Sequence, residues 1–361
     1  MTVARQLLVM AIIVIISFFF SRKNGFGKDA SQYLSRLLLY VINPCMIVST
    51  FDVDFSAAKL KSLSLAIAVS FAFHLAMIIL ATLLFARKKA AQGQTALQGQ
   101  KSGLAEDCLQ GQKSGLAEDC LQGQKSGRDS LSKIGIVFTN SGFIGIPLIN
   151  GVFGSEGVFF LMGYILVFNV LLWIWGEWLM TGTMRPLKIL TNPNVLACAA
   201  GLAVFCLPFK TPYVIIEPLK MIGACNGAAS MILLGLLFAS FGGAKEKSGQ
   251  DKNAAASPAH AFSRPIVLPL ARDVFLRLVV CPLILLAATL FAMRAFSFVS
   301  EIQLIMSVLF IAASCPVGMS VSSFAVVFKK DADYASLLVA VSSAACVVTI
   351  PLLVALLEAL A

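Results

Sequence analysis

The sequence has little charge and few of the residues from which enzymes build catalytic and metal sites. Charged residues make up 13% of the 361-residue chain, about half of the ~25% that is usual in a soluble domain. The chain has two histidines and no Cys-x-x-Cys, His-x-x-x-His or Gly-x-Ser-x-Gly pattern, which argues against a metal site and a nucleophilic enzyme. A soluble protein with so little polar surface would aggregate, so an ordinary cytosolic enzyme is excluded.

The nine cysteines also fail to form a recognisable framework. Their number is odd, and most lie inside apolar runs, where cysteine behaves as a small apolar residue. We therefore expect neither disulfides nor bound zinc, and no cofactor apart from coupling to H⁺ or Na⁺. The cysteines in apolar runs are Cys45, Cys198, Cys206, Cys225, Cys281, Cys315 and Cys346.

Long apolar runs fill most of the chain instead. Hydrophobic residues make up 58% of it, and a bilayer-spanning helix needs ~20 apolar residues. The sequence thus predicts an all-α polytopic membrane protein. No Ala-x-Ala cleavage site follows the first run, so we interpret it as a span and not as a signal peptide. The predicted spans are 4–20, 34–51, 63–86, 134–152, 157–180, 191–208, 213–241, 270–293, 302–328 and 334–358.

The basic residues indicate the topology of these spans. Lys and Arg concentrate in every second loop, beginning with the loop after the first span, and positively charged loops stay in the cytoplasm. Both termini are therefore expected on the outer side of the membrane. The net charge of +10 then reflects loops beside a lipid bilayer and does not indicate a nucleic acid partner.

Two long polar segments and one short loop divide the chain. Residues 87–133 contain a tandem repeat with a period of twelve residues, and we interpret them as a cytoplasmic loop with a disordered repeat, a partner-binding or regulatory loop being the alternative. Residues 242–269 are interpreted as a cytoplasmic linker. The loop 181–190 separates two sets of five spans, residues 1–180 and 191–361. Because five is odd, the second set enters from the opposite side, as in an inverted repeat.

Glycine and proline interrupt the fourth and ninth spans, which occupy the same place in the two halves. Gly145 and Pro147 are the predicted helix breaks in the fourth span, and Pro316 and Gly318 those in the ninth, while Pro44 is a further predicted break in the second. A helix broken inside the membrane frees N–H and C=O groups that must line a cavity or bind something. Paired breaks of this kind indicate the binding site of a transporter. The alternative is a simple proline kink relieved by serine hydroxyls.

Several motifs, in their order along the chain, resemble the auxin efflux carrier family. The fourth span holds Asn140–Leu148 followed by Phe153-Gly154, and the fifth holds Asn169–Gly176. The match extends over nearly the whole chain outside the two long segments, although the longest loop follows the third span and does not lie between the halves, as it does in the plant carriers. The other motifs are Asn43-Pro44, Asn192-Pro193, Pro316, Asp331, Ala335-Ser336 and Pro351.

The resemblance implies both a fold and a function. The fold is ten transmembrane helices in a 5+5 inverted repeat, with broken, crossing helices 4 and 9 in a moving transport domain of spans 3–5 and 8–10. Spans 1, 2, 6 and 7 form a scaffold, which is expected to support a homodimer. The function is secondary active transport of small organic anions, carboxylates such as dicarboxylates or auxin-like acids, across a bacterial inner (plasma) membrane by elevator-like alternating access.

Polar residues inside the spans are the candidates for the site. The resemblance places substrate-carboxylate contacts at Asn140. Asn43 is expected either to bind substrate or to satisfy broken backbone. Ser314 and Ser320, which flank the ninth-span proline, bind substrate or, as serines in membrane helices often do, their own helix backbone. His74 is a proton-relay candidate, with a neutral, hydrogen-bonded histidine as the alternative.

Three other functions stay open on the sequence alone. A sodium-coupled organic anion symporter of the bile-acid type has a similar ten-span fold, but no carboxylate lies deep in the predicted transport spans, so carbonyls and hydroxyls would have to hold its Na⁺. An intramembrane enzyme is disfavoured because His74 is the one base or metal ligand available at that depth. A membrane sensor that signals through residues 87–133 is less favoured than a transporter.

Overall fold

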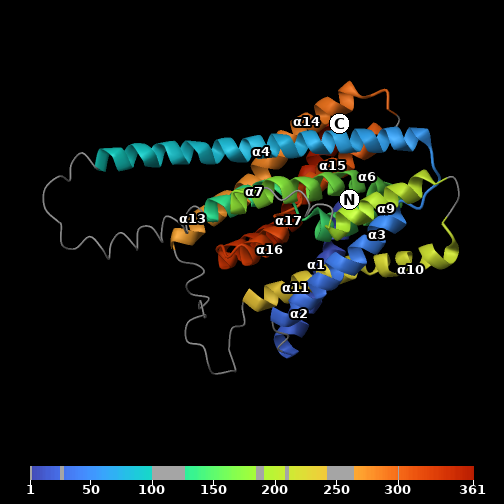
Figure 1. Ribbon diagram of the computed structural model, residues 1–361, viewed down its shortest axis with the longest axis horizontal. Helices are drawn as coiled ribbons and strands as arrows, with labels where there is room; N and C mark the ends of the chain where they lie inside the picture. The colour runs from blue at the N-terminus through green and yellow to red at the C-terminus, as the bar shows by residue number, and fades with distance from the viewer. Residues whose placement is uncertain are drawn as a thin grey trace.

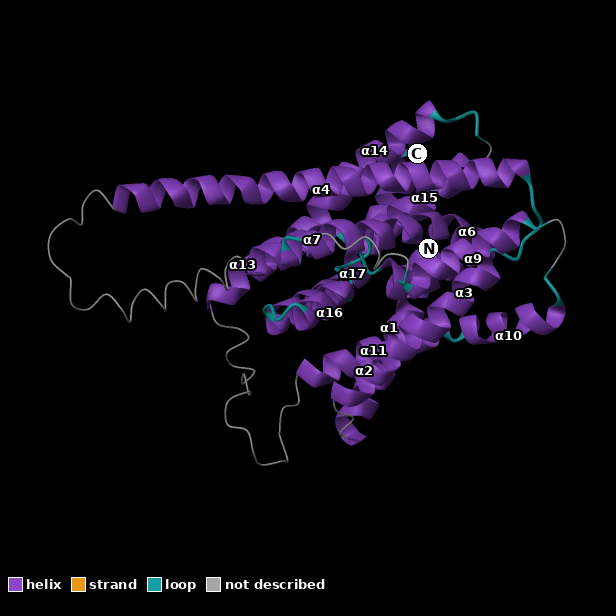
Figure 2. Ribbon diagram, viewed as in Figure 1, coloured by secondary structure: helices purple, strands orange, loops and turns teal. Residues whose placement is uncertain are grey.

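The computed structural model shows a nearly all-helical protein, and the residues that it describes contain no β-strand (Figure 2). The helices are joined mostly by short turns, as expected for a chain that lies largely in lipid, where a helix satisfies its own backbone. The described residues are 2–24, 28–99, 127–183, 191–207, 211–241, 264–299 and 301–361.

The first half of the chain forms long helices that contain short π-helical turns, labelled η. In chain order these elements are α1 (Thr2–Asn24), α2 (Lys28–Leu37), η1 (Leu38–Ile42), α3 (Asn43–Thr50), α4 (Ala57–Gly99), a helix at 127–137, η2 (Ser141–Gly145), α6 (Ile146–Leu171), η3 (Leu172–Gly176) and α7 (Glu177–Thr181).

The second half is built in the same way. Its elements are α9 (Pro193–Cys206), α10 (Tyr213–Ala224), α11 (Asn226–Phe241), α13 (Arg264–Phe275), η4 (Leu276–Val280), α14 (Cys281–Ala295), α15 (Ile302–Ser314), α16 (Ser320–Val327) and α17 (Ala332–Leu360).

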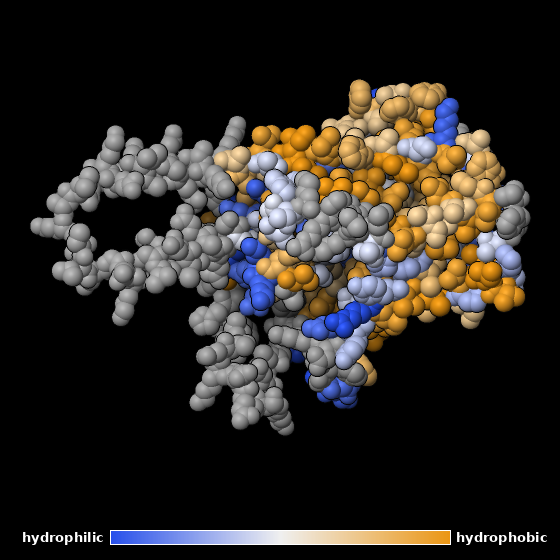
Figure 3. All heavy atoms as spheres, in the orientation of Figure 1, coloured by the Kyte–Doolittle hydropathy of each residue, from blue (hydrophilic) through white to orange (hydrophobic). Residues whose placement is uncertain are grey.

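The described helices make this a multi-pass membrane protein. Seven of them are long and apolar enough to cross a bilayer, and two shorter apolar helices, Pro193–Cys206 and Ile302–Ser314, accompany them. Figure 3 shows the apolar surface that they expose, which is the surface that lipid would cover. The seven are Val3–Asn24, Ala30–Thr50, Ala57–Ala86, Ser141–Thr181, Tyr213–Ala239, Ile266–Ala295 and Ala332–Leu360.

One of the seven, Ser141–Thr181, bends sharply at Gly154. This residue has φ 65° and ψ −159°, a conformation that is essentially restricted to glycine. The bend falls between the predicted spans 134–152 and 157–180. A single run of helix in the structure therefore corresponds to the end of one predicted span and the whole of the next.

The two long segments predicted as loops are partly helical. Helix α4 continues to Gly99, and a helix begins at residue 127, so both ends of the segment 87–133 are helical. The sequence after residue 86 is rich in Lys, Ala and Gln, which are strong helix formers, and a hydropathy pattern does not detect such an extension. Helix α13 likewise begins within the predicted linker 242–269. Most of the tandem repeat, and residues 184–190 of the predicted inter-repeat loop, lie outside the described residues.

The helices pack in two groups (Figure 1). In one group α1 lies along α11, while α3 lies against both α9 and α10. In the other, α6 packs against α4 and α15, and α14 and α17 complete the bundle. Contacts of α6 with α1 and α9 join the groups. Some of these helices pack closely at a glycine. Gly223 of α10 faces the backbone of Met46 in α3, and a Cβ added to Gly223 would lie 2.9 Å from the Met46 Cα.

Two interruptions in the helices meet inside the second group. The first is at residues 138–140 and the second at residues 315–319. They form an antiparallel bridge between Thr139 and Val317. Asn140 N–H donates to the Pro316 carbonyl (2.8 Å), and Gly318 N–H donates to the Phe138 carbonyl (2.9 Å). Each interruption thus supplies the hydrogen-bond partners that the other lacks, and we call this contact the crossover.

The first interruption does not lie at the residues predicted to cause it. Pro316 and Gly318 do lie in the second interruption, but Gly145 and Pro147 are helical, as is Pro44. All three of these residues belong to or follow a π-helical turn: η1 ends just before Asn43-Pro44, and η2 ends with Gly145 just before Ile146-Pro147. A π-turn already lacks the normal hydrogen bonds and is wider, so the proline ring fits without breaking the helix.

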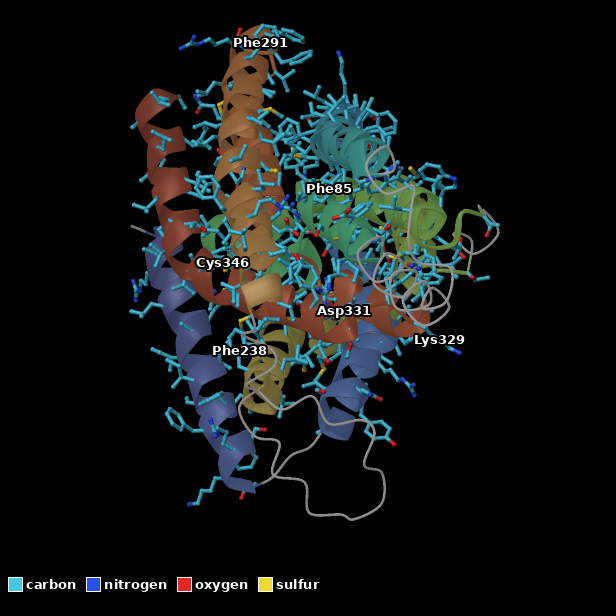
Figure 4. All side chains as sticks on the ribbon, turned by 90° about the vertical axis from the view of Figure 1, so that its left-hand side faces the viewer. Phe85, Phe238, Phe291, Lys329, Asp331 and Cys346 are labelled. Atoms are coloured by element: carbon cyan, nitrogen blue, oxygen red, sulfur yellow. The ribbon has the colours of Figure 1, made fainter. Side chains whose placement is uncertain are left out.

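Charged side chains tie together the ends of three helices. One of them, Asp331, is labelled in Figure 4 just before the start of α17. Arg128, at the start of the helix 127–137, pairs with Asp331 at 2.5 Å. Asp331 also caps α17 by accepting a hydrogen bond from Tyr334 N–H. The Tyr334 hydroxyl donates to the buried carboxylate of Asp273 in α13 (2.6 Å), which also pairs with Arg272. This network fixes the helix 127–137, which leads into the crossover, and α13 relative to α17.

We predict that Gly318 tolerates no larger side chain. A Cβ on this residue would lie 2.8 Å from the Thr139 carbonyl oxygen and 3.1 Å from that of Phe138, and neither can move without opening the crossover. Gly318→Ala should therefore destabilise the protein by about 1–3 kcal/mol, seen as a lower unfolding temperature of the purified protein. Gly142→Ala is the matched control, because a Cβ there meets nothing within 4 Å. Equal unfolding temperatures for the two variants would contradict the prediction.

Candidate functional site

A cavity of about 150 Å³ lies beside the crossover, between the two groups of helices. Its walls come from α2, η1 and α3 on one side and from η2, α6, η3 and the start of α16 on the other, with the start of α9 between them. Its polar lining consists of asparagine, serine and threonine side chains. These are Ser35, Asn43, Thr139, Asn140, Ser141, Asn169, Asn192, Asn194, Ser320 and Ser323.

The structure brings three of the predicted site residues together and leaves two elsewhere. Asn140, Asn43 and Ser320 all line the cavity. Ser314 is fully buried in the last turn of α15 and is not part of the lining. His74 lies in a separate narrow cleft. Binding roles for these residues stay predictions, but the cavity gives three of them a common place to act.

Two helices begin at the cavity wall. After Asn140 the chain enters η2, and Asn140 O accepts hydrogen bonds from Ile144 N–H (2.9 Å) and Gly145 N–H (3.2 Å). After the second interruption, Ser320 begins α16. The first N–H groups of a helix have no partner within it, and they carry the positive end of the helix dipole. Both helix starts line the same cavity, so their partial positive charges add at one point.

Several buried polar atoms of the lining have no hydrogen-bond partner within the described structure. They are the Asn140 side-chain nitrogen, the hydroxyls of Ser141 and Ser320, and the side-chain oxygen of Asn194. A buried polar group without a partner costs roughly 1–3 kcal/mol, so native proteins seldom leave several in one place. A bound ligand would supply what these atoms lack.

The other asparagines of the lining are held by the protein itself. Asn43 accepts a hydrogen bond from the Asn226 side chain at 2.5 Å, which links α3 to the start of α11. Asn192 caps α9 by accepting from Asn194 N–H (2.9 Å) and Val195 N–H (3.2 Å). These contacts orient amide groups toward the cavity. Asn43 therefore joins two helices and also lines the site, while its predicted roles, binding substrate or satisfying broken backbone, stay predictions.

None of the residues in the lining is ionisable, yet a cation lies directly behind the crossover. Arg277 of η4 is completely buried. Its guanidinium group donates to the Cys315 carbonyl from Nε (3.1 Å) and Nη2 (2.9 Å), to the Ile136 carbonyl from Nη1 (2.8 Å), and to the Ala313 carbonyl. These carbonyls belong to the last turns of the two helices that end at the crossover.

His74 is placed beside this arginine and away from the cavity. Both line the narrow cleft with Tyr164. His74 Nδ1 lies 2.8 Å from the Ser70 carbonyl, which can only accept, so Nδ1 carries a proton and donates it to this hydrogen bond. The imidazole packs on the Tyr164 ring with 4.6 Å between ring centroids. A role in proton relay stays a prediction. Among the described residues, no three His, Cys, Asp or Glu side chains come together in a group that would hold a metal ion.

Residues 178–354 match the model of a family described as membrane transport protein. The family is one of transporters and includes the auxin efflux carriers, so the resemblance drawn from the sequence motifs is confirmed. The segment runs from α7 through most of α17 and holds the second interruption, while the first lies before it. No curated protein matches the chain.

Several residues near the crossover were not among the predicted site residues. Asn169, Asn192 and Asn194 line the cavity, and Arg277 supports it from behind. Asn169 and Asn192 do fall within the motifs that indicated the family, so the motifs held the signal. Arg277 is a functional candidate on the sequence alone, because an ionisable group inside a transmembrane helix is one by default; snorkelling or pairing at the membrane interface is the alternative that the sequence leaves open.

We predict that Ser320→Ala leaves folding intact and weakens ligand binding. The Ser320 hydroxyl has no partner within the described structure, so its removal breaks no hydrogen bond and leaves the unfolding temperature unchanged or slightly higher. Ser343→Ala is the matched control, because its hydroxyl is also buried without a partner but does not line the cavity. Thermal-shift titration with carboxylates should show weaker binding for Ser320→Ala alone. Equal binding by both variants would count against the site.

Proposed function

We propose that the protein is a secondary active transporter of small organic anions, carboxylates such as dicarboxylates or auxin-like acids, in a bacterial inner membrane. The observation that carries this proposal is the cavity at the crossover. There two helix N-terminal ends and several unpartnered polar atoms converge on a space without ionisable lining residues. The transporter family supports the proposal at the level of function.

The electrostatics of the cavity favour an anion over a cation. Helix N-terminal ends bind carboxylates and phosphates because their N–H groups are donors and their dipoles are positive. The amide nitrogen of Asn140 and the hydroxyls of Ser141 and Ser320 add donors at the same place. With no carboxylate in the lining, no fixed negative charge opposes an acid. The cavity volume, about 150 Å³, is sufficient for a small acid.

The two packing groups support an alternating-access mechanism. We infer ten crossings in a 5+5 inverted repeat, in which the kinked run Ser141–Thr181 and the short helices α9 and α15 supply the crossings beyond those of the long helices. The group of α1, α3, α9, α10 and α11 then serves as scaffold, and the group with the crossover moves. The cavity lies between them, as an elevator-like movement of the crossover past the scaffold requires. A homodimer through the scaffold stays a prediction.

The direction in which the cavity faces follows from the predicted topology. With both termini outside, Ser35, Asn192 and Ser323 lie near the cytoplasmic ends of their spans. All three line the cavity, which supports an inward-facing state.

An aromatic cluster closes the opposite end in this account. Phe51 of α3 and Phe205 of α9, both on the scaffold, pack against Phe159 of α6 with ring centroids 5.5 Å and 5.4 Å apart. All three rings are buried. In the inferred topology they lie toward the outer surface, where the moving group meets the scaffold. Separation of Phe159 from the two scaffold rings would open the outer side.

The direct test of the function is uptake into proteoliposomes. We expect the wild type to accumulate labelled succinate or indole-3-acetate, and Asn140→Ala to lose at least tenfold in uptake, because one amide donor is removed from a desolvated anion. Asn150→Ala is the matched control: this asparagine is exposed on α6 and does not line the cavity, and its uptake should equal that of wild type.

The same assay separates the alternatives. Uptake that requires Na⁺ would favour a sodium-coupled symporter of the bile-acid type, and uptake driven by a pH gradient would favour H⁺ coupling. Equal uptake by wild type and Asn140→Ala would remove Asn140 from the site. Absence of uptake for every acid tested, by protein that is folded and inserted, would contradict the proposed function.

Alternating access gives a further prediction for Phe159. Phe159→Ala should weaken closure of the outer side, so that a cysteine introduced as Ser320→Cys reacts severalfold faster with a membrane-impermeant maleimide added from outside. Labelling of the same protein without Ser320→Cys gives the background from native cysteines. Phe298→Ala, at an exposed phenylalanine, is the matched control. An unchanged rate for Phe159→Ala would contradict a gate at this cluster.

A further inference from the structure

Arg277 is an unusual residue for the interior of a membrane protein. It is 0% exposed, and an unpaired charge at membrane depth is costly. It forms no salt bridge with a carboxylate among the described residues. All of its hydrogen bonds go to backbone carbonyls. The charge must therefore be balanced by those carbonyls.

The carbonyls that Arg277 contacts are the negative ends of two helices. Ile136 lies in the last turn of the helix 127–137, and Ala313 and Cys315 lie at the end of α15. A helix C-terminal end carries roughly half a negative charge. Two such ends together carry about one, which is the charge that a single guanidinium group neutralises. The planar fork of arginine also lets one side chain reach both helix ends at once.

This neutralisation has a consequence for the cavity on the other side of the crossover. The N-terminal ends of η2 and α16 begin within a few residues of the two C-terminal ends. Without a compensating cation, the negative ends would oppose the positive ones, and the potential in the cavity would be weaker. With Arg277 in place, the positive ends act on the cavity unopposed, although no basic side chain lines it.

We propose that Arg277 is a positioning residue that makes the cavity selective for anions, acting through the two helix ends that it neutralises and without touching the ligand. The proposal rests on the proposed function, because it assigns a role within the same site. The ligand class is a small carboxylate, and Arg277 acts on the charge of the ligand and not on its shape. Arg277 differs in this from Asn140 and Ser320, which face the ligand directly.

The test compares each acid with its uncharged amide. Purified wild type, Arg277→Gln and Arg277→Lys are titrated with phenylacetate and phenylacetamide, and with succinate and succinamide, in a thermal-shift assay. Wild type should prefer the acids. Arg277→Lys keeps the charge and should keep most of the preference, with a lower unfolding temperature because an ammonium group cannot reach both helix ends. Arg277→Gln should lose about tenfold of the preference for acid over amide.

The comparison with the amide distinguishes an electrostatic role from a structural one. A cavity that was merely distorted would bind acid and amide equally less well, and the ratio would stay at its wild-type value; that result in Arg277→Gln would overturn the proposal. If Arg277→Gln and a second neutral variant, Arg277→Met, both fail to fold while Arg277→Lys folds, Arg277 serves folding alone and the selectivity role is overturned. If wild type binds none of the acids, the proposed function itself fails, and this inference with it.

Discussion

The structure depends on one constraint: backbone polar groups exposed by a helix interruption inside a membrane must find partners, because lipid offers none. Here two interruptions satisfy one another. Phe138 and Pro316 provide the carbonyls, and Gly318 and Asn140 the N–H groups. The Val317 N–H donates to the Ser342 hydroxyl at 3.2 Å, and Arg277 donates to the carbonyls of Ile136, Ala313 and Cys315. In the proposed site this arrangement makes the two sides of the crossover chemically different, because Arg277 neutralises the C-terminal helix ends and the N-terminal ends face the cavity.

A site built in this way needs no charged side chain of its own. Its donors are helix starts, amides and hydroxyls, which are fixed in position by the crossover and by contacts such as the Asn43–Asn226 hydrogen bond. A neutral lining also costs less to move across a bilayer than a charged one. If the protein carries an anion as we propose, this cost is a physical reason for placing Arg277 behind the backbone and not in the lining.

The sequence predicted more of the architecture than of the site. Apolar runs located the membrane helices, and paired Gly/Pro segments located the region of the crossover, with Pro316 and Gly318 in the second interruption itself. The position of Pro147 did not predict where the first interruption lies, because this proline follows a π-turn and the helix continues through it. Pro44 likewise follows a π-turn and does not break its helix. Asn140, Asn43 and Ser320 were predicted on motif and position. Ser314 and His74 were not brought to the cavity, because which face of a helix a polar residue occupies depends on packing that local sequence does not encode.

The central claim is that a carboxylate is held by helix ends and amides, and not by a basic side chain. A structure determined with bound 4-bromophenylacetate tests it most directly, because the bromine locates the ligand by anomalous scattering. We expect the carboxylate in the cavity, about 3 Å from the Asn140 amide nitrogen and from N–H groups that begin η2 or α16. A carboxylate paired with a lysine or arginine side chain, or bound outside the cavity, would contradict it.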